Sequence, residues 1–227
     1  MSTDTPASVK AWEAFCEQLK GAGSVLARPT TPRDDLTQAE GLRKLVRLIR
    51  MGLEATLEYG DPAHPEVYPL VTPTTLGEGE TSDARYYQAM LDGRRTYVLS
   101  GERGDAPFME FTVYAGKIGL DAHSAQVGAL TERELKVDRE GRYEIVLSPE
   151  RQPGNWIRTT PEASCIFIRQ YAHDWNRTVG ATFHMRERSS DGERPNVTLA
   201  QVMAAPSHGR LCCTLGGNLG RDRRQDA

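Results

Sequence analysis

Residues 164–171 read Ser-Cys-Ile-Phe-Ile-Arg-Gln-Tyr, an apolar run with the two-residue period of a β-strand. Successive side chains of a strand point to opposite faces, so Phe167 and Arg169 share one face while Ile166 and Ile168 share the other. The same period recurs at residues 96–100, 108–114, 135–138, 143–148 and 181–186. The sequence therefore predicts at least six strands.

Short turns separate several of these strands. Residues 101–105 read Gly-Glu-Arg-Gly-Asp and follow the strand at 96–100. Residues 139–142 read Arg-Glu-Gly-Arg and follow the strand at 135–138. Connections of this length predict two hairpins, and the strands of a hairpin pair antiparallel.

Two helices are expected before the strands. Over residues 8–19 apolar side chains recur at three- and four-residue steps, with Ser8 as the N-cap. A capping box, Thr37-Gln38-Ala39-Glu40, opens a longer helix. Its apolar face is expected to consist of Leu42, Leu45, Val46, Ile49, Leu53 and Leu57, and Gly60-Asp61-Pro62 ends it.

The connection to the strands is rich in proline from residue 62 to residue 79, and residues 82–90 predict a short third helix. The expected fold is mainly β: an antiparallel β-sandwich, jelly-roll-like, with two to three N-terminal α-helices. Residues 1–92 would form a helical segment and connection packed on the sandwich. Residues 93–188 would form the sandwich core, and residues 189–227 a polar, partly disordered tail.

Composition excludes several classes of partner. A chain of 227 residues with 38% hydrophobic content is long enough for a substantial core. The net charge of -3 and the scattered basic residues argue against nucleic acid and against an anionic membrane as partners. The N-terminus lacks the pattern of a signal peptide, and no run approaches the length of a spanning helix. We expect a cytoplasmic protein.

The four cysteines predict neither disulfides nor a metal site. Cys16 falls in a predicted helix and Cys165 in a predicted strand, where small apolar residues are expected. The pair Cys212-Cys213 lacks the spacing of zinc ligands. No phosphate-binding loop or nucleophile motif occurs, so we expect no cofactor and no metal.

Several segments together resemble a family known as domain of unknown function 1214 (DUF1214), over roughly residues 9–188. The segments are residues 39–43, 83–93, 97–104, 147–148, 153–156 and 168–175, the last reading Ile-Arg-Gln-Tyr-Ala-His-Asp-Trp. The resemblance implies a jelly-roll-like sandwich with N-terminal helices and brings no established reaction. The chain departs from the family's usual pattern at Thr81-Ser82-Asp83 and in its C-terminal residues.

Arg169 is one of two residues that architecture alone does not explain. A guanidinium beside Phe167 is costly to bury unless acceptors receive its five donors. One hypothesis is an internal bridge to a carboxylate, with Glu110 or Asp92 as the candidates. The other is that Arg169 binds the carboxylate or sulfate of an anionic ligand.

His173 and Asp174 are the candidate catalytic residues, with His173 as a general base. Adjacent residues of an extended chain point apart, so the two are not expected to pair with each other. His173 could instead approach His184 across a hairpin, with Asp121 or His123 nearby, as a metal or acid–base site. The alternative is that both histidines lie at strand ends and form ordinary hydrogen bonds.

Four further residues are candidates for ligand binding. Asn155 and Trp156 follow Pro153-Gly154, a turn that can place both side chains at the mouth of a sandwich. Trp156 would either stack on a ligand or close the end of the core. Tyr86, on the predicted short helix, would supply an aromatic wall if a pocket exists between helix and sheet, and Tyr171 is a further candidate for ligand binding.

Three functions follow from these residues. The first is a module that binds a small, partly apolar or anionic metabolite, or a protein partner. The second is a hydrolase or lyase without cofactor, with His173 as base and Arg169 as anion clamp. The third is a structural homo-oligomer in which the long helix packs against a copy of itself.

Overall fold

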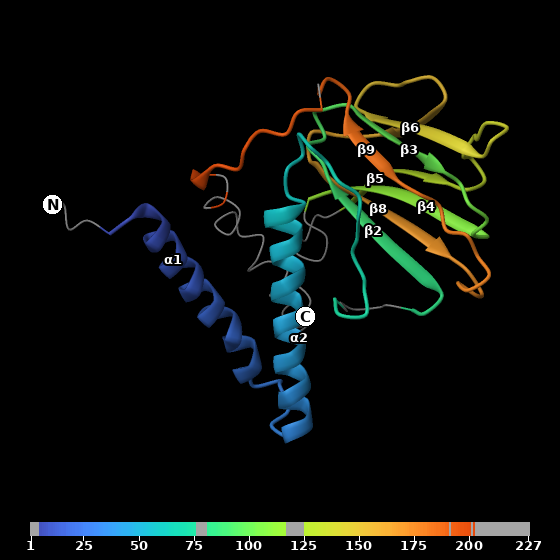
Figure 1. Cartoon of the computed structure of the whole chain (residues 1–227). Helices are drawn as coiled ribbons and strands as arrows, with labels where there is room; N and C mark the ends of the chain where they lie inside the picture. The colour runs from blue at the N-terminus through green and yellow to red at the C-terminus, as the bar shows by residue number, and fades with distance from the viewer. Residues whose placement is uncertain (1–4, 76–80, 117–124, 191, 201, 203–227) are drawn as a thin grey trace, which may run out of the picture. The chain divides into compact units, whose positions relative to one another are not determined.

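The computed structural model describes residues 5–75, 81–116, 125–190, 192–200 and 202 (Figure 1). The chain divides into two compact units, Met1–Glu58 with Pro195–Ala227, and Tyr59–Arg194. The first contains helices and the second contains strands, so the predicted class, mainly β with N-terminal helices, is confirmed. Among the described residues, no helix has both the length and the apolar character that crossing a bilayer requires. The predictions for Asp121, His123 and the residues from 203 onward fall outside the described part.

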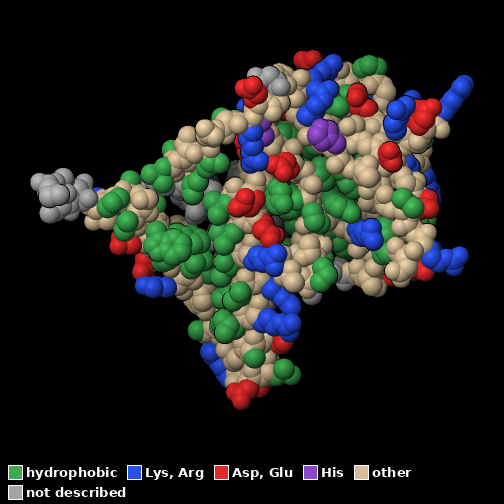
Figure 2. Space-filling view, in the orientation of Figure 1, with side chains coloured by type: hydrophobic (Ala, Val, Ile, Leu, Met, Phe, Trp, Pro, Cys, Tyr) green, Lys and Arg blue, Asp and Glu red, His purple; other side chains and the backbone are tan. Residues whose placement is uncertain are grey.

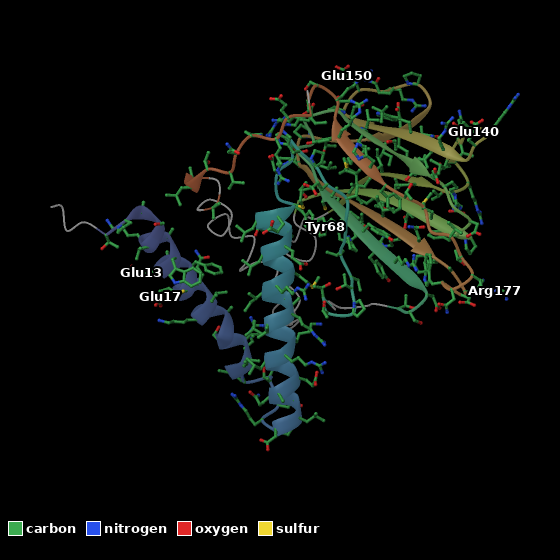
Figure 3. The ribbon with its side chains drawn as sticks, viewed as in Figure 1. Glu13, Glu17, Tyr68, Glu140, Glu150 and Arg177 are labelled. Carbon is green, nitrogen blue, oxygen red and sulfur yellow. The ribbon has the colours of Figure 1, made fainter. Side chains whose placement is uncertain are left out.

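The helical unit is a pair of helices joined by a short connection. It consists of α1 (Ala7–Ala22), the 3-10 helix η1 (Gly23–Ala27), α2 (Asp35–Leu53) and the π-helical turn η2 (Glu54–Glu58). Val25, Leu45 and Leu48 form its buried core, against which Phe15 and Leu19 pack. Glu13 and Glu17 lie on the solvent side of α1 (Figure 3).

Both helices are confirmed, but their predicted caps are wrong. Ser8 lies inside α1, which begins after Pro6. The N-cap of α2 is Asp34, whose carboxylate accepts the Thr37 backbone N–H at 2.9 Å. Asp34 is as good a cap as threonine, and it starts the helix a turn earlier than the capping box would. The buried residues of α2 are Leu45, Leu48 and Gly52, whereas Leu42 and Val46, which were predicted for the apolar face, are more than half exposed.

The second unit contains two sheets. The first has the order β1-β2-β8-β4-β5, and the second has the order β7-β6-β3-β9. All neighbouring strands pair antiparallel except β6 and β7, which are parallel. The strands are β1 (Tyr68–Pro69), β2 (Ala84–Met90), β3 (Tyr97–Glu102), β4 (Phe108–Ala115), β5 (Ala125–Thr131), β6 (Arg142–Ser148), β7 (Asn155–Arg158), β8 (Ala163–Tyr171) and β9 (His184–Glu187).

One hydrophobic core joins the two sheets into a sandwich. Ile166 and Ile168 of β8 are fully buried, as are Ile145 and Leu147 of β6 in the other sheet, and all four belong to the same cluster. β8 lies in the middle of its sheet, between β2 and β4. The apolar half of residues 164–171 therefore faces the core, as the alternation predicts.

Residues 82–90 were predicted as a helix, and this is wrong: they contain β2, which pairs with β8 from Ala84 to Met90. Tyr86 and Tyr87 thus lie on a strand and not on a helix. Aromatic residues favour strands, and pairing with β8 along the whole of β2 outweighs the helix-capping signal at Ser82. Tyr68 of β1 extends this edge, since its ring stacks on Tyr59 at 4.1 Å and its hydroxyl donates to Gln88 at 2.7 Å (Figure 3).

Both predicted hairpins are also wrong. β3 and β4 are successive in sequence but lie in different sheets. Residues 135–138 form no strand, because Asp138 accepts the backbone N–H groups of Glu140 and Arg142 and holds a turn. β5 and β7 were not predicted.

Candidate functional site

A pocket of about 580 Å³ lies in the sandwich unit beside β9. β9 is the last strand of its sheet, so one of its edges has no strand neighbour among the residues that the structure describes. Two stretches of chain line the pocket: Ala63, His64, Pro65, Glu66 and Val67, and then Phe183, His184, Met185, Arg186, Glu187, Ser190, Gly192 and Arg194. Figure 2 shows histidine side chains among acidic and basic ones on the face that carries β9.

The floor of this pocket is apolar. Met185 is part of the hydrophobic core, and Val67 and Phe183 pack against that core. The Phe183 ring contacts the Tyr87 ring at 4.9 Å and the Phe111 ring at 6.3 Å, which anchors it between the two sheets. An apolar part of a ligand would therefore contact side chains held by the core itself.

The rim of the pocket carries charged and polar side chains from β9. Exposure alternates along β9, as expected for a strand: His184 and Arg186 are exposed, whereas Met185 and Glu187 are buried. Within the part of the chain that the structure describes, no hydrogen bond or ion pair engages the Arg186 guanidinium or the His184 ring. Arg186 is therefore a cation without a carboxylate partner among the described residues, and it lies in the lining of this pocket.

The carboxylates of the pocket are already paired. Glu66 accepts from the Arg194 guanidinium at 2.6 Å. Glu187 is only 6% exposed, and Ser189 donates to it from both its backbone N–H and its hydroxyl. Neither carboxylate neutralises Arg186, so the charge left for a ligand at this rim is positive.

His64 joins the two stretches that line the pocket. Its Nδ1 lies 2.9 Å from the Asp61 carboxylate, and its Nε2 lies 2.8 Å from the backbone carbonyl of Glu193. The hydrogen bond to Asp61 raises the pKa of His64. Partial burial acts to raise the pKa of Asp61, but its hydrogen bonds with His64 and Ala63 outweigh burial and lower it. The pair thus favours an imidazolium beside a carboxylate.

Arg169 lies elsewhere, on the first sheet, and it has an internal partner. Its guanidinium lies 3.2 Å from the Glu110 carboxylate and 3.5 Å from the Tyr114 hydroxyl. Glu110 is the residue opposite Arg169 on β4, and Tyr86 is the one opposite on β2. The structure thus contains the carboxylate bridge that the sequence offered as one explanation of Arg169.

The structure brings together some of the predicted binding residues and separates others. Arg169, Tyr86 and Tyr171 share the outer face of the first sheet, where Tyr171 packs edge-on against Phe108 at 5.4 Å. Asn155 and Trp156 belong to β7 in the second sheet. A single site containing all five is therefore not formed.

Asn155 and Trp156 make internal contacts. The Asn155 amide accepts from the Lys136 N–H at 2.8 Å and donates to the carbonyls of Lys136 and Glu144 at 2.8 and 3.0 Å. The Trp156 indole donates to the Ser148 hydroxyl at 3.0 Å, and the Arg151 guanidinium lies over its ring. Both N–H donors of the Asn155 amide, and one of the two lone pairs of its oxygen, thus form hydrogen bonds that hold residues 136 and 144 to β7.

His173 and Asp174 are exposed just after β8. Asp174 accepts the Asn176 backbone N–H at 2.9 Å, which closes a turn. His184 belongs to β9, in the other sheet, so no hairpin brings it to His173. In the residues that can be described, no three His, Cys, Asp or Glu side chains gather as metal ligands.

Residues of the pocket beside β9 were not recognised from sequence, apart from His184. His64 and Glu193 are 129 residues apart, and no motif connects positions at that separation. The one local signal is the spacing of Asp61 and His64, which lie three residues apart in a proline-rich turn.

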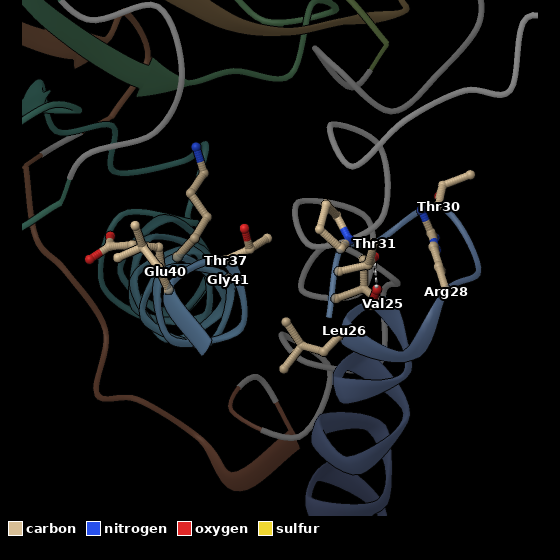
Figure 4. A pocket seen from close by; sticks show the side chains of 11 residues that line it. Val25, Leu26, Arg28, Thr30, Thr31, Thr37, Glu40 and Gly41 are labelled. Atoms are coloured by element: carbon tan, nitrogen blue, oxygen red, sulfur yellow. Dashed lines mark hydrogen bonds between the residues drawn. The ribbon is translucent and has the colours of Figure 1, made fainter. Parts of the chain in front are cut away.

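The helical unit has a second pocket of about 560 Å³, lined by the end of η1, the residues that follow it and the start of α2 (Figure 4). Thr31 donates to the Val25 carbonyl there at 3.1 Å. Its one lining carboxylate, Glu40, pairs with Arg43 on the helix surface. The structure thus offers it no cation comparable to Arg186, since Arg28 and Lys44 both have partners.

The family model described as "Protein of unknown function (DUF1214)" matches residues 81–174. This confirms, over that range, the resemblance expected from the sequence. The range contains β2 to β8 and ends before β9. No curated protein matches the chain.

The chain is similar to solved structures. An uncharacterized protein from Burkholderia cenocepacia is similar over 92% of this chain at 28% identity, with a TM-score of 0.85, and the chain spans 57% of its length. The VPA0106 protein from Vibrio parahaemolyticus is similar over 77% of this chain and 51% of its own, at 18% identity and a TM-score of 0.40.

Proposed function

We propose that this chain, whose residues 81–174 match the DUF1214 family, is a binding module for a small, partly apolar anion held in the pocket beside β9. The observation that carries the proposal is the Arg186 guanidinium, which is exposed and has no carboxylate partner among the described residues. It lines the same pocket as the apolar side chains of Val67, Phe183 and Met185. A guanidinium binds a carboxylate through two parallel hydrogen bonds, which are about twice as strong as neutral ones.

The apolar floor narrows the class of ligand. Val67, Phe183 and Met185 offer contact to a ring or a short aliphatic chain but no charge. A carboxylic acid with such a body would satisfy both parts of the pocket, whereas a small inorganic anion would satisfy only Arg186. The proposed ligand is therefore an organic acid whose apolar part is about the size of one ring.

The anion-clamp role of Arg169 remains a prediction, with less support than the role of Arg186. Arg169 already has Glu110 at 3.2 Å, so a ligand would have to displace a carboxylate or share the guanidinium. The enzyme hypothesis rests on His173, which is exposed after β8 and, among the described residues, has no carboxylate that would orient its ring. Binding without catalysis is therefore the function that the geometry supports best.

The two remaining hypotheses concern location and assembly. We propose a cytoplasmic location, supported by the free thiols of Cys16 and Cys165. Burial raises the pKa of the Cys165 thiol to about 11, so it stays protonated and unreactive at neutral pH. Self-association through α2 stays a prediction, for which the exposure of Leu42 and Val46 is the one observation in favour.

The test measures the binding of benzoate and cyclohexanecarboxylate by NMR chemical-shift perturbation and by thermal unfolding. Phosphate serves as the comparison, because it is an anion without an apolar part. We expect both organic acids to shift signals of residues 183–187 and phosphate to bind more weakly. Arg186→Gln should raise the dissociation constant for benzoate about tenfold or more, since a hydrogen bond to a charged group contributes about 1.5–3 kcal/mol.

Arg188→Gln is the matched control. It removes the same charge two residues further along, from an exposed arginine that lies outside the pocket lining and contacts Gln152. It should leave benzoate binding unchanged. Absence of benzoate and cyclohexanecarboxylate binding at millimolar concentration, or equal losses in both variants, would refute the proposed site.

A further inference from the structure

Residues 192–194, here called the strap, contact the opposite stretch of the pocket beside β9 through a hydrogen bond to a backbone carbonyl and through an ion pair. The His64 ring contacts the Glu193 carbonyl, and Arg194 pairs with Glu66 at 2.6 Å. Gly192 and Arg194 of the strap line the pocket, as do His64 and Glu66 on the opposite stretch. His64 thus supplies one of the contacts that hold the strap.

The geometry of the His64 contacts requires a particular protonation state. A carboxylate and a backbone carbonyl can only accept hydrogen bonds, and His64 contacts one of each, at 2.9 and 2.8 Å. Both ring nitrogens must therefore carry a proton, which is the case only in the imidazolium. Neutral imidazole has one N–H, and the charged Asp61 carboxylate is the stronger acceptor for it, so loss of the proton removes the bond to the Glu193 carbonyl.

We propose that His64 is a proton-operated latch, which holds the strap while the ring is charged and releases it when the ring becomes neutral. The charged groups around the ring act in opposite directions. Asp61, on the same turn, stabilises the charge, whereas Arg194, on the strap, opposes it while pairing with Glu66. The consequence for the ligand, weaker binding at higher pH, rests on the proposed function.

The latch is tested without a ligand, by NMR across pH 5.5 to about 9. The His64 ring signals and the amide signals of Gly192, Glu193 and Arg194 should titrate with one shared midpoint, above the ordinary histidine value of 6.5. In His64→Gln the amide signals of the strap should lose this transition. Asp61→Asn, which keeps an acceptor but removes the charge, should lower the midpoint while the fold is retained.

Strap signals that do not follow the His64 midpoint, or that titrate equally in His64→Gln, would overturn the latch. Benzoate then tests its consequence: in the wild type the dissociation constant should rise about five- to tenfold across the midpoint, the effect of one net hydrogen bond. In His64→Gln it should stay level. Absence of benzoate binding at every pH would count against the proposed function alone, since the NMR transition decides the latch by itself.

Discussion

At the level of single residues, polar side chains differ in whether their donors and acceptors already have partners within the protein. Asn155 was a candidate binding residue, and its amide is committed to three backbone groups of residues 136 and 144. Arg186 was not a candidate, and its guanidinium is uncommitted among the residues described. A polar side chain that is already satisfied stabilises the fold, and one without a partner is free to bind.

Replacing Asn155 with alanine should therefore destabilise the protein. The side chain is 8% exposed, and its loss leaves the backbone N–H and C=O of Lys136 without their partner. We expect the free energy of unfolding to fall by about 2–4 kcal/mol, measured by urea denaturation. Asn176→Ala, at an exposed turn position, is the control and should change it by less than about 0.5 kcal/mol. An equal effect of the two substitutions would contradict the structural role.

At the scale of elements, β8 determines how the sandwich is built. Its residues alternate between the core, with Ile166 and Ile168 fully buried, and an outer face where Phe167, Arg169 and Tyr171 are half-buried. β2 and β4 flank it over nearly its whole length. Cross-strand pairs such as Arg169 and Glu110 are thus expected to stabilise the sheet, whether or not they also belong to a binding site.

A double-mutant cycle on Arg169 and Glu110 measures this contribution. The side chains are 26% and 25% exposed, so solvent screens the pair and we expect a coupling of about 0.5–1 kcal/mol in the free energy of unfolding. Arg169→Met and Glu110→Gln, alone and together, form the cycle, read out by urea denaturation. A coupling of zero would show that the bridge does not stabilise the sheet and would return Arg169 to the list of candidate anion sites.

At the scale of the whole molecule, the stability of the sandwich unit should depend on pH through His64. The ring links residues 61–66 to residues 193–194, at opposite ends of the unit's sequence. Its folded-state pKa is raised above the ordinary value of 6.5. A raised pKa means that the stabilising contribution is fully present below pH 6.5 and is lost as pH rises through the folded-state value.

The difference in free energy of unfolding between wild type and His64→Gln should therefore be largest below pH 6.5 and shrink as the pH is raised to about 9. Urea denaturation at a series of pH values measures it. The lowered pKa of Asp61 acts in a separate window, since its contribution is lost only as pH falls below 3.8. A difference that grows with pH above 6.5 would contradict the charged state of His64.

The amino-acid sequence is sufficient to predict the class of fold, because alternation with period two and apolar spacing of three to four residues are local patterns. It also identified β8 with its buried and half-buried faces, and it named Glu110 as one of two candidate partners of Arg169. Strand pairing was not determined: β3 and β4 look like a hairpin but lie in different sheets.

The position of the pocket depends on contacts between segments that are far apart in the sequence. The pocket beside β9 joins residues 63–67 to residues 183–194, and the contact between His64 and Glu193 spans 129 residues. Contacts at that separation arise from how strands are ordered in the two sheets, and no local pattern encodes that order. Whether a polar side chain has an internal hydrogen-bond partner therefore depends on which distant segments the fold brings next to it.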